Sequence, residues 1–205
     1  MSPRRRKAED VDVFDALVAV MKRRGPSELT LRAIAAEAGV TAGALVQRFG
    51  SKRALLLAHA RHAAATGDVG VTMPRPRTAS PMETLRTITA AYAQLATSPR
   101  AAVRNLAYLH HDLADPALRR HLLRLSRAAR AWYERRLGEA VAAGELRADV
   151  EVRTLARLIE VVLRGSLLSW ALYREGPAAV WLREDLEAAL RPYLARGKSR
   201  TRQRA

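Results

Sequence analysis

Three consecutive residues, Ser51, Lys52 and Arg53, carry side chains suited to binding an anion. Ser51 can cap a helix that runs to about Thr66, so both cations fall in the first turn of that helix. Cations at a helix N-terminus oppose the helix dipole, at a cost of a few tenths of a kcal/mol up to about 1 kcal/mol. A bound phosphate group would reverse the sign of this effect. The pattern therefore indicates a partner that carries phosphate.

Two short helices that precede these cations are expected to meet at a glycine. Residues 30–49 contain Ala35, Gly39 and Leu45, a spacing that suits a crossed pair of helices. Ala35 is small enough for close approach, and Gly39 can adopt the left-handed conformation of a tight turn. Val40 and Leu45 would fill the angle between the helices. In such a helix-turn-helix, the second helix lies in the DNA major groove and offers its N-terminal residues to base edges.

The formal net charge of +16 at pH 7 also favours an anionic partner. Residues 1–66 carry 12 basic and 6 acidic side chains, and residues 196–205 carry five basic side chains and no acidic one. A clustered excess of cations is the electrostatic footprint of nucleic-acid binding. An Arg- and Ala-rich composition from a GC-rich genome is an alternative for the body of the chain, but it does not explain the two ends.

Helix signals run almost continuously along the chain, and no segment reads as a strand. Apolar residues make up 49% and aromatic residues 5%, so the core must consist of Leu, Val and Ala, which favour helices. Ser80, Ser98 and Asp115 each precede a proline, the signal for a cap followed by the first helical residue. We expect Asp149 to cap the penultimate helix and Pro177 to open the last, which ends near Arg196. The sequence predicts an all-α fold of about nine helices.

Residues 10–57 resemble the DNA-binding domain of the tetracycline-repressor (TetR/AcrR) family of transcription regulators. The matching elements are Leu29–Ala35, Ala38–Thr41, then Gly43, Leu45 and Phe49, and finally Ser51 and Lys52 with Leu55 and Leu56. The resemblance implies a homodimer that binds double-stranded operator DNA and responds to a small-molecule effector. The rest of the chain resembles the family only in length and helical character.

The resemblance also implies which residues meet DNA. It assigns Thr30, Arg32 and Lys52 to phosphates, and it turns Thr41, Ala42, Gly43, Ala44 and Gln47 toward the groove. The family usually has Tyr where Val46 stands and His where Arg48 stands. Val46 cannot donate a hydrogen bond but could touch a thymine methyl group, whereas Arg48 could replace the lost phosphate contact with a charge. We expect Gln47 to be the base reader, because an amide suits the two edge groups of adenine.

Four segments are expected along the chain. Residues 1–8 form a disordered basic arm, 9–58 the helix-turn-helix domain, 59–196 the helical ligand-binding and dimerisation domain, and 197–205 a disordered basic tail. Within the third segment, residues 67–79 contain Gly67, Gly70, Pro74 and Pro76, which are typical of a linker or mobile loop.

The last two helices carry apolar stripes that the resemblance places at the dimer contact. The expected interface residues are Leu155, Ile159, Val162, Ser166, Trp170, Leu186 and Leu190. The alternative is that both stripes belong to the core of a single chain. A homodimer is expected on either reading, because two half-sites are needed to give a small helix-turn-helix useful affinity.

The middle helices contain polar or amphipathic residues among apolar ones, where the resemblance implies an effector pocket. The candidate ligand-binding residues are Tyr92, Arg104, Asn105, Tyr108, His111, Trp132 and Arg164. The alternative for each is an ordinary place at the surface or rim. His110 and His111 lie about 100° apart on a helix, and the pair His59 and His62 would make only a weak metal site, so neither a metal nor a cofactor is expected.

The sequence argues against an enzyme. It has no Cys, no Gly-rich phosphate loop and no nucleophile elbow, and we expect no metal or cofactor chemistry. No apolar run is long enough to span a membrane, and the first residues lack the apolar core of a signal peptide, so we expect a cytoplasmic protein.

The predicted function is that of a transcription repressor which a small, mostly apolar molecule releases from its operator. Two alternatives remain: a regulator that needs its ligand to bind DNA, and an architectural protein that coats nucleic acid without sequence choice. The second alternative leaves more than a hundred residues of apolar helix without a role.

Overall fold

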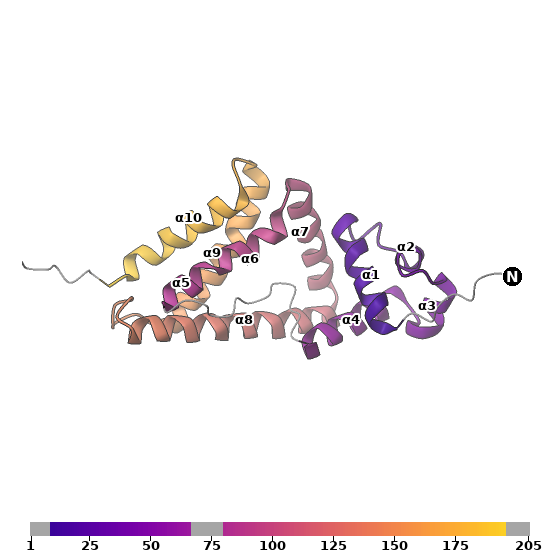
Figure 1. Ribbon diagram of the computed structural model, residues 1–205, viewed down its shortest axis with the longest axis horizontal. Coiled ribbons are helices and arrows are strands. Elements are labelled where there is room, and N and C mark those ends of the chain that lie inside the picture. Colours follow the sequence, from indigo (N-terminus) through magenta and orange to yellow (C-terminus); the bar gives the residue numbers. More distant parts are fainter. Residues whose placement is uncertain (1–8, 67–79, 196–205) are drawn as a thin grey trace, which may run out of the picture. The chain divides into compact units, whose positions relative to one another are not determined.

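A computed structural model describes residues 9–66 and 80–195, and within these ranges every regular element is helical (Figure 1). Ten α-helices and two 3₁₀ turns are present in the described part of the chain. The prediction of an all-α fold is confirmed. The count exceeds nine because the helix expected after Ser80 is divided at Thr87 into two short helices. The expected arm, tail and linker of residues 67–79 lie outside the described residues.

The chain divides into two compact units, the first comprising residues 1–72 and 95–126 and the second residues 73–94 and 127–205. Helix α8, Pro116–Ala142, contributes its first part to one unit and its remainder to the other. No described helix is long and apolar enough to cross a membrane.

The first unit begins with four helices: α1 (Asp10–Arg23), α2 (Leu31–Glu37), α3 (Ala42–Phe49) and α4 (Lys52–Thr66). Hydrogen bonds from the first-turn amides of Ala33, Ala44 and Ala54 are accepted by the predicted caps, each at 3.1 Å. The caps are the hydroxyl oxygens of Thr30, Thr41 and Ser51. The core of these helices includes Val13, Phe14, Leu17, Val20, Ile34, Leu45 and Leu55, all buried.

Helix α7 (Pro99–Ala114) completes the first unit together with the start of α8. Tyr108 of α7 and Leu118 of α8 are buried in the same apolar cluster as the residues of α1 to α4. The predicted cap-and-proline signals are confirmed, because Ser98 accepts a hydrogen bond from the amide of Ala101, and Asp115 one from that of Ala117. The DNA-binding helices therefore share a core with later helices of the chain.

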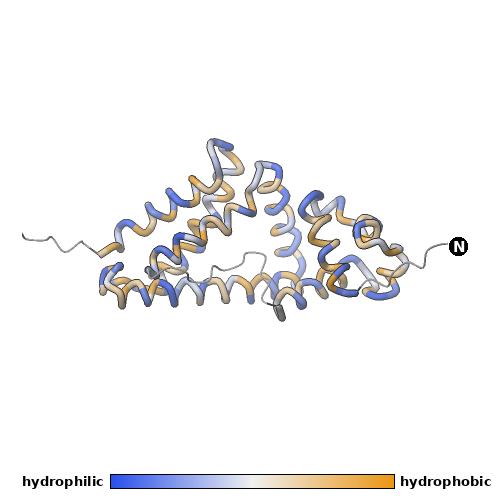
Figure 2. Tube along the Cα trace, viewed as in Figure 1, coloured by the Kyte–Doolittle hydropathy of each residue, from blue (hydrophilic) through white to orange (hydrophobic). Residues whose placement is uncertain are grey.

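The second unit contains α5 (Pro81–Arg86), α6 (Ile88–Ala93), the rest of α8, α9 (Val152–Tyr173) and α10 (Ala178–Leu190). The 3₁₀ turns are η1 (Gln94–Ala96) and η2 (Arg191–Tyr193). Along α10, hydrophilic and hydrophobic residues alternate, as expected of a helix with one buried face (Figure 2). Its buried side chains Leu182, Leu186 and Leu190 face the core that α9 and α6 share with it.

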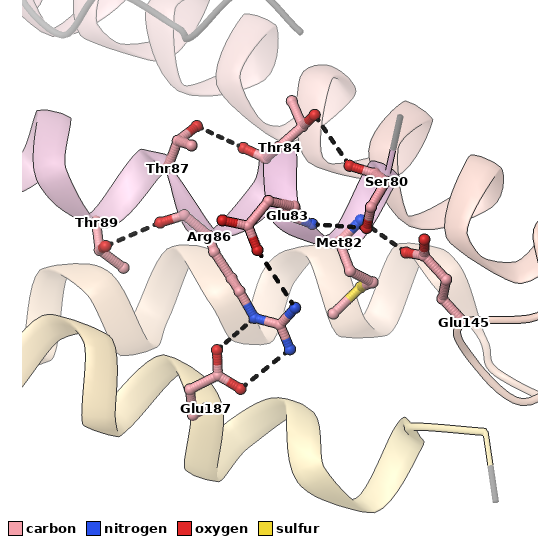
Figure 3. Close-up of polar contacts among 9 residues, drawn as sticks. All are labelled: Ser80, Met82, Glu83, Thr84, Arg86, Thr87, Thr89, Glu145 and Glu187. Atoms are coloured by element: carbon pink, nitrogen blue, oxygen red, sulfur yellow. Dashed lines mark hydrogen bonds and ion pairs between the residues drawn. The ribbon is translucent and has the colours of Figure 1, made fainter. Parts of the chain in front are cut away.

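Polar contacts attach α5 to elements far along the chain (Figure 3). The Arg86 guanidinium donates to both carboxylate oxygens of Glu187 on α10, and the amide of Met82 donates to the Glu145 carboxylate at 2.8 Å. Ser80 caps this helix, as the sequence predicts, by accepting a hydrogen bond from the amide of Glu83. These contacts fix the start of the second unit.

Two predicted helix ends have shifted. The N-cap of α9 is Glu151, which accepts a hydrogen bond from the amide of Thr154 at 2.9 Å, rather than Asp149. Asp149 instead pairs with Arg147. The last helix ends at Leu190 and is followed by the turn η2, so it stops before the expected Arg196. Pro192 explains this end, because proline has no amide N–H to donate and is not tolerated in the interior of an α-helix.

Candidate DNA-binding surface

The turn between α2 and α3 has the geometry of a helix-turn-helix. Ala35 and Leu45 are buried where the two helices meet, and Gly39 has a φ of +68°, a conformation that strains any residue with a Cβ atom. The amide of Val40 donates to the carbonyl of Ala35 at 3.0 Å and closes the turn. The local arrangement therefore matches the predicted one.

Helix α3 buries Leu45 and exposes most of its remaining side chains. Thr41, Gly43, Ala44, Val46 and Gln47 are exposed. Ala42 is half-buried and packs against the core. The Thr41 oxygen accepts a hydrogen bond from the amide of Ala44 and caps the helix. Gln47 carries the side-chain amide on this exposed face of α3. The expected groove-facing residues thus lie together on one surface, apart from the partly covered Ala42.

Arg48 forms an ion pair with Asp10 at the start of α1, and its guanidinium lies 5.5 Å from the centroid of the Phe49 ring. The side chain expected to bind a phosphate therefore has a carboxylate partner within the protein. Both groups are accessible to solvent, so a phosphate could replace the carboxylate.

The two cations at the start of α4 differ in their environment. Lys52 is half-buried, whereas Arg53 is exposed and donates to both oxygens of Asp115, at 3.0 Å for one of them. This hydrogen bond is the main cause that lowers the pKa of Asp115 to about 2. The sequence predicts a phosphate partner for both cations, and for Arg53 this prediction is corrected, because its guanidinium pairs with Asp115.

The four expected ligand residues of the first unit have contacts of structural character. The Tyr108 hydroxyl donates to the backbone carbonyl of Arg24 at 2.9 Å, and Asn105 donates to the carbonyl of Leu95. His111 lies 3.1 Å from the carboxylate of the adjacent Asp112. Arg104 holds its Nε buried, without a hydrogen-bond partner among the described residues. Burial of the ring is the main cause that raises the pKa of Tyr108 to about 12.

The other expected ligand residues, Tyr92, Trp132 and Arg164, lie in the second unit beside residues that the sequence argument missed. Tyr133 is fully buried and donates to the hydroxyl of Tyr92 at 3.2 Å, and burial raises the pKa of Tyr133. Trp132 makes an edge contact with the Tyr133 ring. Glu160 is also buried, and two arginines, Arg130 and Arg164, pair with it. Glu160 stands between Ile159 and Val161 on an apolar helix, and this position in the sequence could have indicated a buried carboxylate.

Two histidines of α4 pack against an aromatic ring of α1. His59 and His62 both lie against the Phe14 ring, with centroids 5.7 and 5.0 Å away. Both side chains are half-buried.

The expected dimer residues turn out to be core of their own chain. Leu155, Ile159, Ser166, Trp170, Leu186 and Leu190 are buried in the second unit, and only Val162 is half-buried. A side chain that its own chain covers has no surface for a partner, so the six assignments of buried residues are corrected, and that of Val162 stays a prediction. The exposed apolar face of α9 lies elsewhere, at Val161, Leu168 and Leu172, which are 62, 56 and 76% exposed.

Two sequence models of protein families match the chain. The model of bacterial regulatory proteins of the tetR family matches residues 13–59, and the model of the tetracyclin repressor-like C-terminal domain matches residues 110–186. Together they cover more than half of the chain. No curated protein matches significantly.

Solved structures share the fold at low identity. A putative regulator from Saccharomonospora viridis in complex with choline has a TM-score of 0.75 and 17% identity over 91% of this chain and 98% of its own. SmeT, the repressor of the Stenotrophomonas maltophilia multidrug efflux pump SmeDEF, has a TM-score of 0.66 and 22% identity over 93% of each chain. FadR from Bacillus subtilis in complex with stearoyl-CoA has a TM-score of 0.64 and 18% identity over 88% of this chain and 97% of its own.

The two family matches agree with the helix-turn-helix geometry of α2 and α3 and with the all-helical second unit. The chain belongs to the TetR family of DNA-binding transcription regulators, which are not enzymes.

Proposed function

We propose that this regulator is a homodimeric repressor that leaves its operator when a small, mostly apolar molecule binds the helices of residues 80–175. The observation that carries the proposal is the direct attachment of α7 and α8 to the DNA-binding helices. Tyr108 of α7 donates to the carbonyl that ends α1, and Asp115 at the start of α8 accepts from Arg53 of α4. A displacement of α7 or α8 would therefore pull on two helices that position α3.

The solved relatives support a ligand-responsive role without fixing the ligand. SmeT is a repressor, and two other relatives hold stearoyl-CoA and choline. A long acyl chain and a small quaternary cation have little chemistry in common. We therefore infer the apolar character of the effector from the apolar helices of this chain and take no ligand from its relatives.

For the DNA contact, we propose that α3 enters the major groove with its exposed face, Thr41 to Ala44 and Val46 to Arg48. Thr30, Arg32 and Lys52 would hold backbone phosphates on either side. Thr30 and Arg32 are exposed at the start of α2 and Lys52 is half-buried at the start of α4, the helices that precede and follow α3 in the chain. Most DNA-binding energy comes from phosphate contacts, while base contacts supply the sequence choice.

For the dimer, we propose that a second copy covers the exposed face of α9. Val161, Gly165, Leu168 and Leu172 are spaced by four, three and four residues and are all exposed, so they form one stripe. An exposed apolar stripe of this length on a water-facing helix is typical of a protein contact. Gly165 at its centre would allow two copies of the helix to approach closely.

The test begins with a duplex selected from a random library by the purified protein. Compounds that raise the melting temperature are then added to the protein–duplex complex. Release of the duplex by the stabilising compounds is the expected result. Compounds that stabilise the fold but leave DNA affinity unchanged would refute the switch, and a protein that binds the duplex only with ligand would reverse its sign.

The competing architectural role predicts different DNA behaviour. A coating protein would bind selected and random duplexes with equal affinity at every salt concentration. A specific regulator should keep a preference of about a thousandfold or more for the selected duplex at physiological salt. A salt titration on both duplexes separates the two roles.

A further inference from the structure

A basic groove lies in the first unit between the end of α1 and the start of α2. It has a volume of about 550 Å³, and Val20 and two alanines supply its apolar lining. Its polar lining consists of Arg23, Arg24, Thr30, Arg32 and Glu37. A groove of this kind matches a tetrahedral anion, because guanidinium groups and hydroxyls are donors suited to phosphate oxygens.

The charges of the groove leave two arginines uncompensated. Arg23 pairs with Glu37, so that pair contributes no net charge. Neither Arg24 nor Arg32 has an ion-pair partner in residues 9–66 or 80–195, and both are exposed. Thr30 accepts the amide of Ala33 with its oxygen, which leaves its hydroxyl proton free to donate outward.

A second groove on the same helices has the opposite sign. It is lined by Asp12, Asp15 and Glu37 together with the backbone of the turn at Gly39, and it has a volume of about 510 Å³. DNA phosphates would be repelled there and attracted to the basic groove. The two grooves therefore give α1 and α2 one acidic side and one basic side, and only the basic side suits the DNA backbone.

The end of α1 is held by a residue from a later helix. The Tyr108 hydroxyl donates to the Arg24 carbonyl at 2.9 Å, and the ring is buried in the shared core. Arg24 is the C-cap of α1: its backbone angles are extended, and its amide donates to the Val20 carbonyl at 2.9 Å. The hydrogen bond from Tyr108 adds a second restraint, on the carbonyl of Arg24.

We propose that this groove binds a DNA backbone phosphate, with Arg24 as a phosphate-contacting residue in addition to Thr30 and Arg32, and with Tyr108 as the residue that positions Arg24. The proposal rests on the proposed placement of α3 in the major groove. It extends the DNA interface to the end of α1 and makes one of its phosphate contacts depend on α7.

The first experiment compares Arg24→Ala with Lys22→Ala in the full-length protein. Both changes remove one cation from the last turns of α1, but Lys22 does not line the groove. We expect Arg24→Ala to weaken binding to selected and random duplexes alike, by about tenfold, and to lower the salt slope by about one. Lys22→Ala should change both quantities much less. Equal effects of the two variants would overturn the phosphate contact.

The second experiment tests Tyr108 through Arg24. Tyr108→Phe should weaken DNA binding in the native background and have no further effect in the Arg24→Ala background. A merely structural role would give the same loss in both backgrounds. Thermal unfolding of each variant, measured without DNA, reports the stability change separately.

A third measurement separates DNA phosphate from a free anion. Inorganic phosphate replaces chloride at constant ionic strength, and the melting temperature of the protein is recorded. The proposal expects little stabilisation. Strong stabilisation that Arg24→Ala removes, with an unchanged salt slope on DNA, would assign the groove to a small anion instead. If the native protein shows no preference for any duplex, the operator proposal fails while the Arg24 result on random DNA still stands.

Discussion

At the scale of single residues, the exposed face of α3 offers few groups that can read a base. Gly43, Ala44 and Val46 present no polar side-chain atoms, and the oxygen of Thr41 already caps the helix. Gln47 carries an exposed amide that can pair with both edge groups of adenine. Sequence choice at this surface should therefore depend strongly on one side chain.

We predict that Gln47→Ala erodes discrimination by about 1–3 kcal/mol at one base pair of each half-site. Affinity for random DNA should hardly change, because the amide contacts no phosphate. Selection from a random library measures the preferred sequence of the variant and of the native protein. The same selected sequence for Gln47→Ala and the native protein would exclude Gln47 as the reader.

The neighbouring cations Lys52 and Arg53 should behave differently. Lys52→Ala should weaken binding to selected and random DNA by similar factors and lower the salt slope by about one. Arg53→Ala should leave the slope unchanged, since Asp115 occupies that guanidinium. Affinity measured against salt concentration for both variants decides the matter, and a loss confined to the selected duplex would argue against Lys52 as a phosphate contact.

At the scale of elements, the ion pair of Arg53 and Asp115 ties α4 to the start of α8. It makes the attachment sensitive to acid. The pKa of Asp115 is about 2 in the folded protein, below the roughly 3.9 of an unfolded Asp, so the carboxylate stabilises the fold above about pH 4. That contribution is lost as the pH falls toward 2.

We expect Asp115→Asn to remove this part of the acid sensitivity. Denaturant unfolding at pH 6 and at pH 3 should show a smaller fall in stability for the variant than for the native protein. Asp112, whose pKa is raised first by burial and also by the charge of Asp115, is present in both proteins, so only its coupling to Asp115 differs between them. An equal fall in the two proteins would show that the ion pair contributes nothing to acid stability.

Helix α9 has two apolar faces, which explains why its sequence misled the assignment of the dimer contact. Leu155, Ile159 and Leu163 are buried in the unit, while Leu168 and Leu172 are exposed on the other side. Periodicity reveals that an apolar face exists but does not reveal what covers it. Which apolar residues of α9 belong to the core became clear only from the packing of α10 and α6 on this helix.

Helix starts, by contrast, were largely predictable from sequence, because a cap and its helix are neighbours in the chain. Thr30, Thr41, Ser80 and Ser98 act as their residue types indicate. Contacts between distant residues were not predictable. Arg130, one of the two partners of Glu160, is 30 residues away, and Arg24, the partner of Tyr108, is 84 residues away, and no local pattern encodes such pairs.

The two faces of α9 give a direct mutational test. Leu168→Arg should yield a folded monomer with weakened operator binding, since it places an unpaired charge in the proposed contact. Ser166→Arg should instead lower the melting temperature, because Ser166 is buried and donates to Asp185 at 2.6 Å. Sedimentation and thermal unfolding of both variants distinguish these results. An intact dimer of Leu168→Arg would move the interface away from this face.

At the scale of the whole molecule, the proposed switch requires effector and operator to change each other's affinity by the same factor. A ligand that lowers operator affinity binds the DNA-bound dimer more weakly by the same factor, typically about 5–150-fold. Ligand affinity with and without saturating operator DNA should show this factor. Unequal factors in the two directions would mean that a further equilibrium, such as dimer dissociation, intervenes.

The ion pair between Arg48 and Asp10 has a consequence for how the regulator is distributed in a cell. A chromosome offers about 10⁶ or more competing sites, and most of the protein is held on them. To grip a random phosphate, Arg48 must first give up a carboxylate that already satisfies it, so the exchange gains little. Asp10 thus competes with the DNA backbone for Arg48 at the operator and at random sites alike. We therefore expect the ion pair to shorten each stay on DNA without changing the ratio of the two affinities.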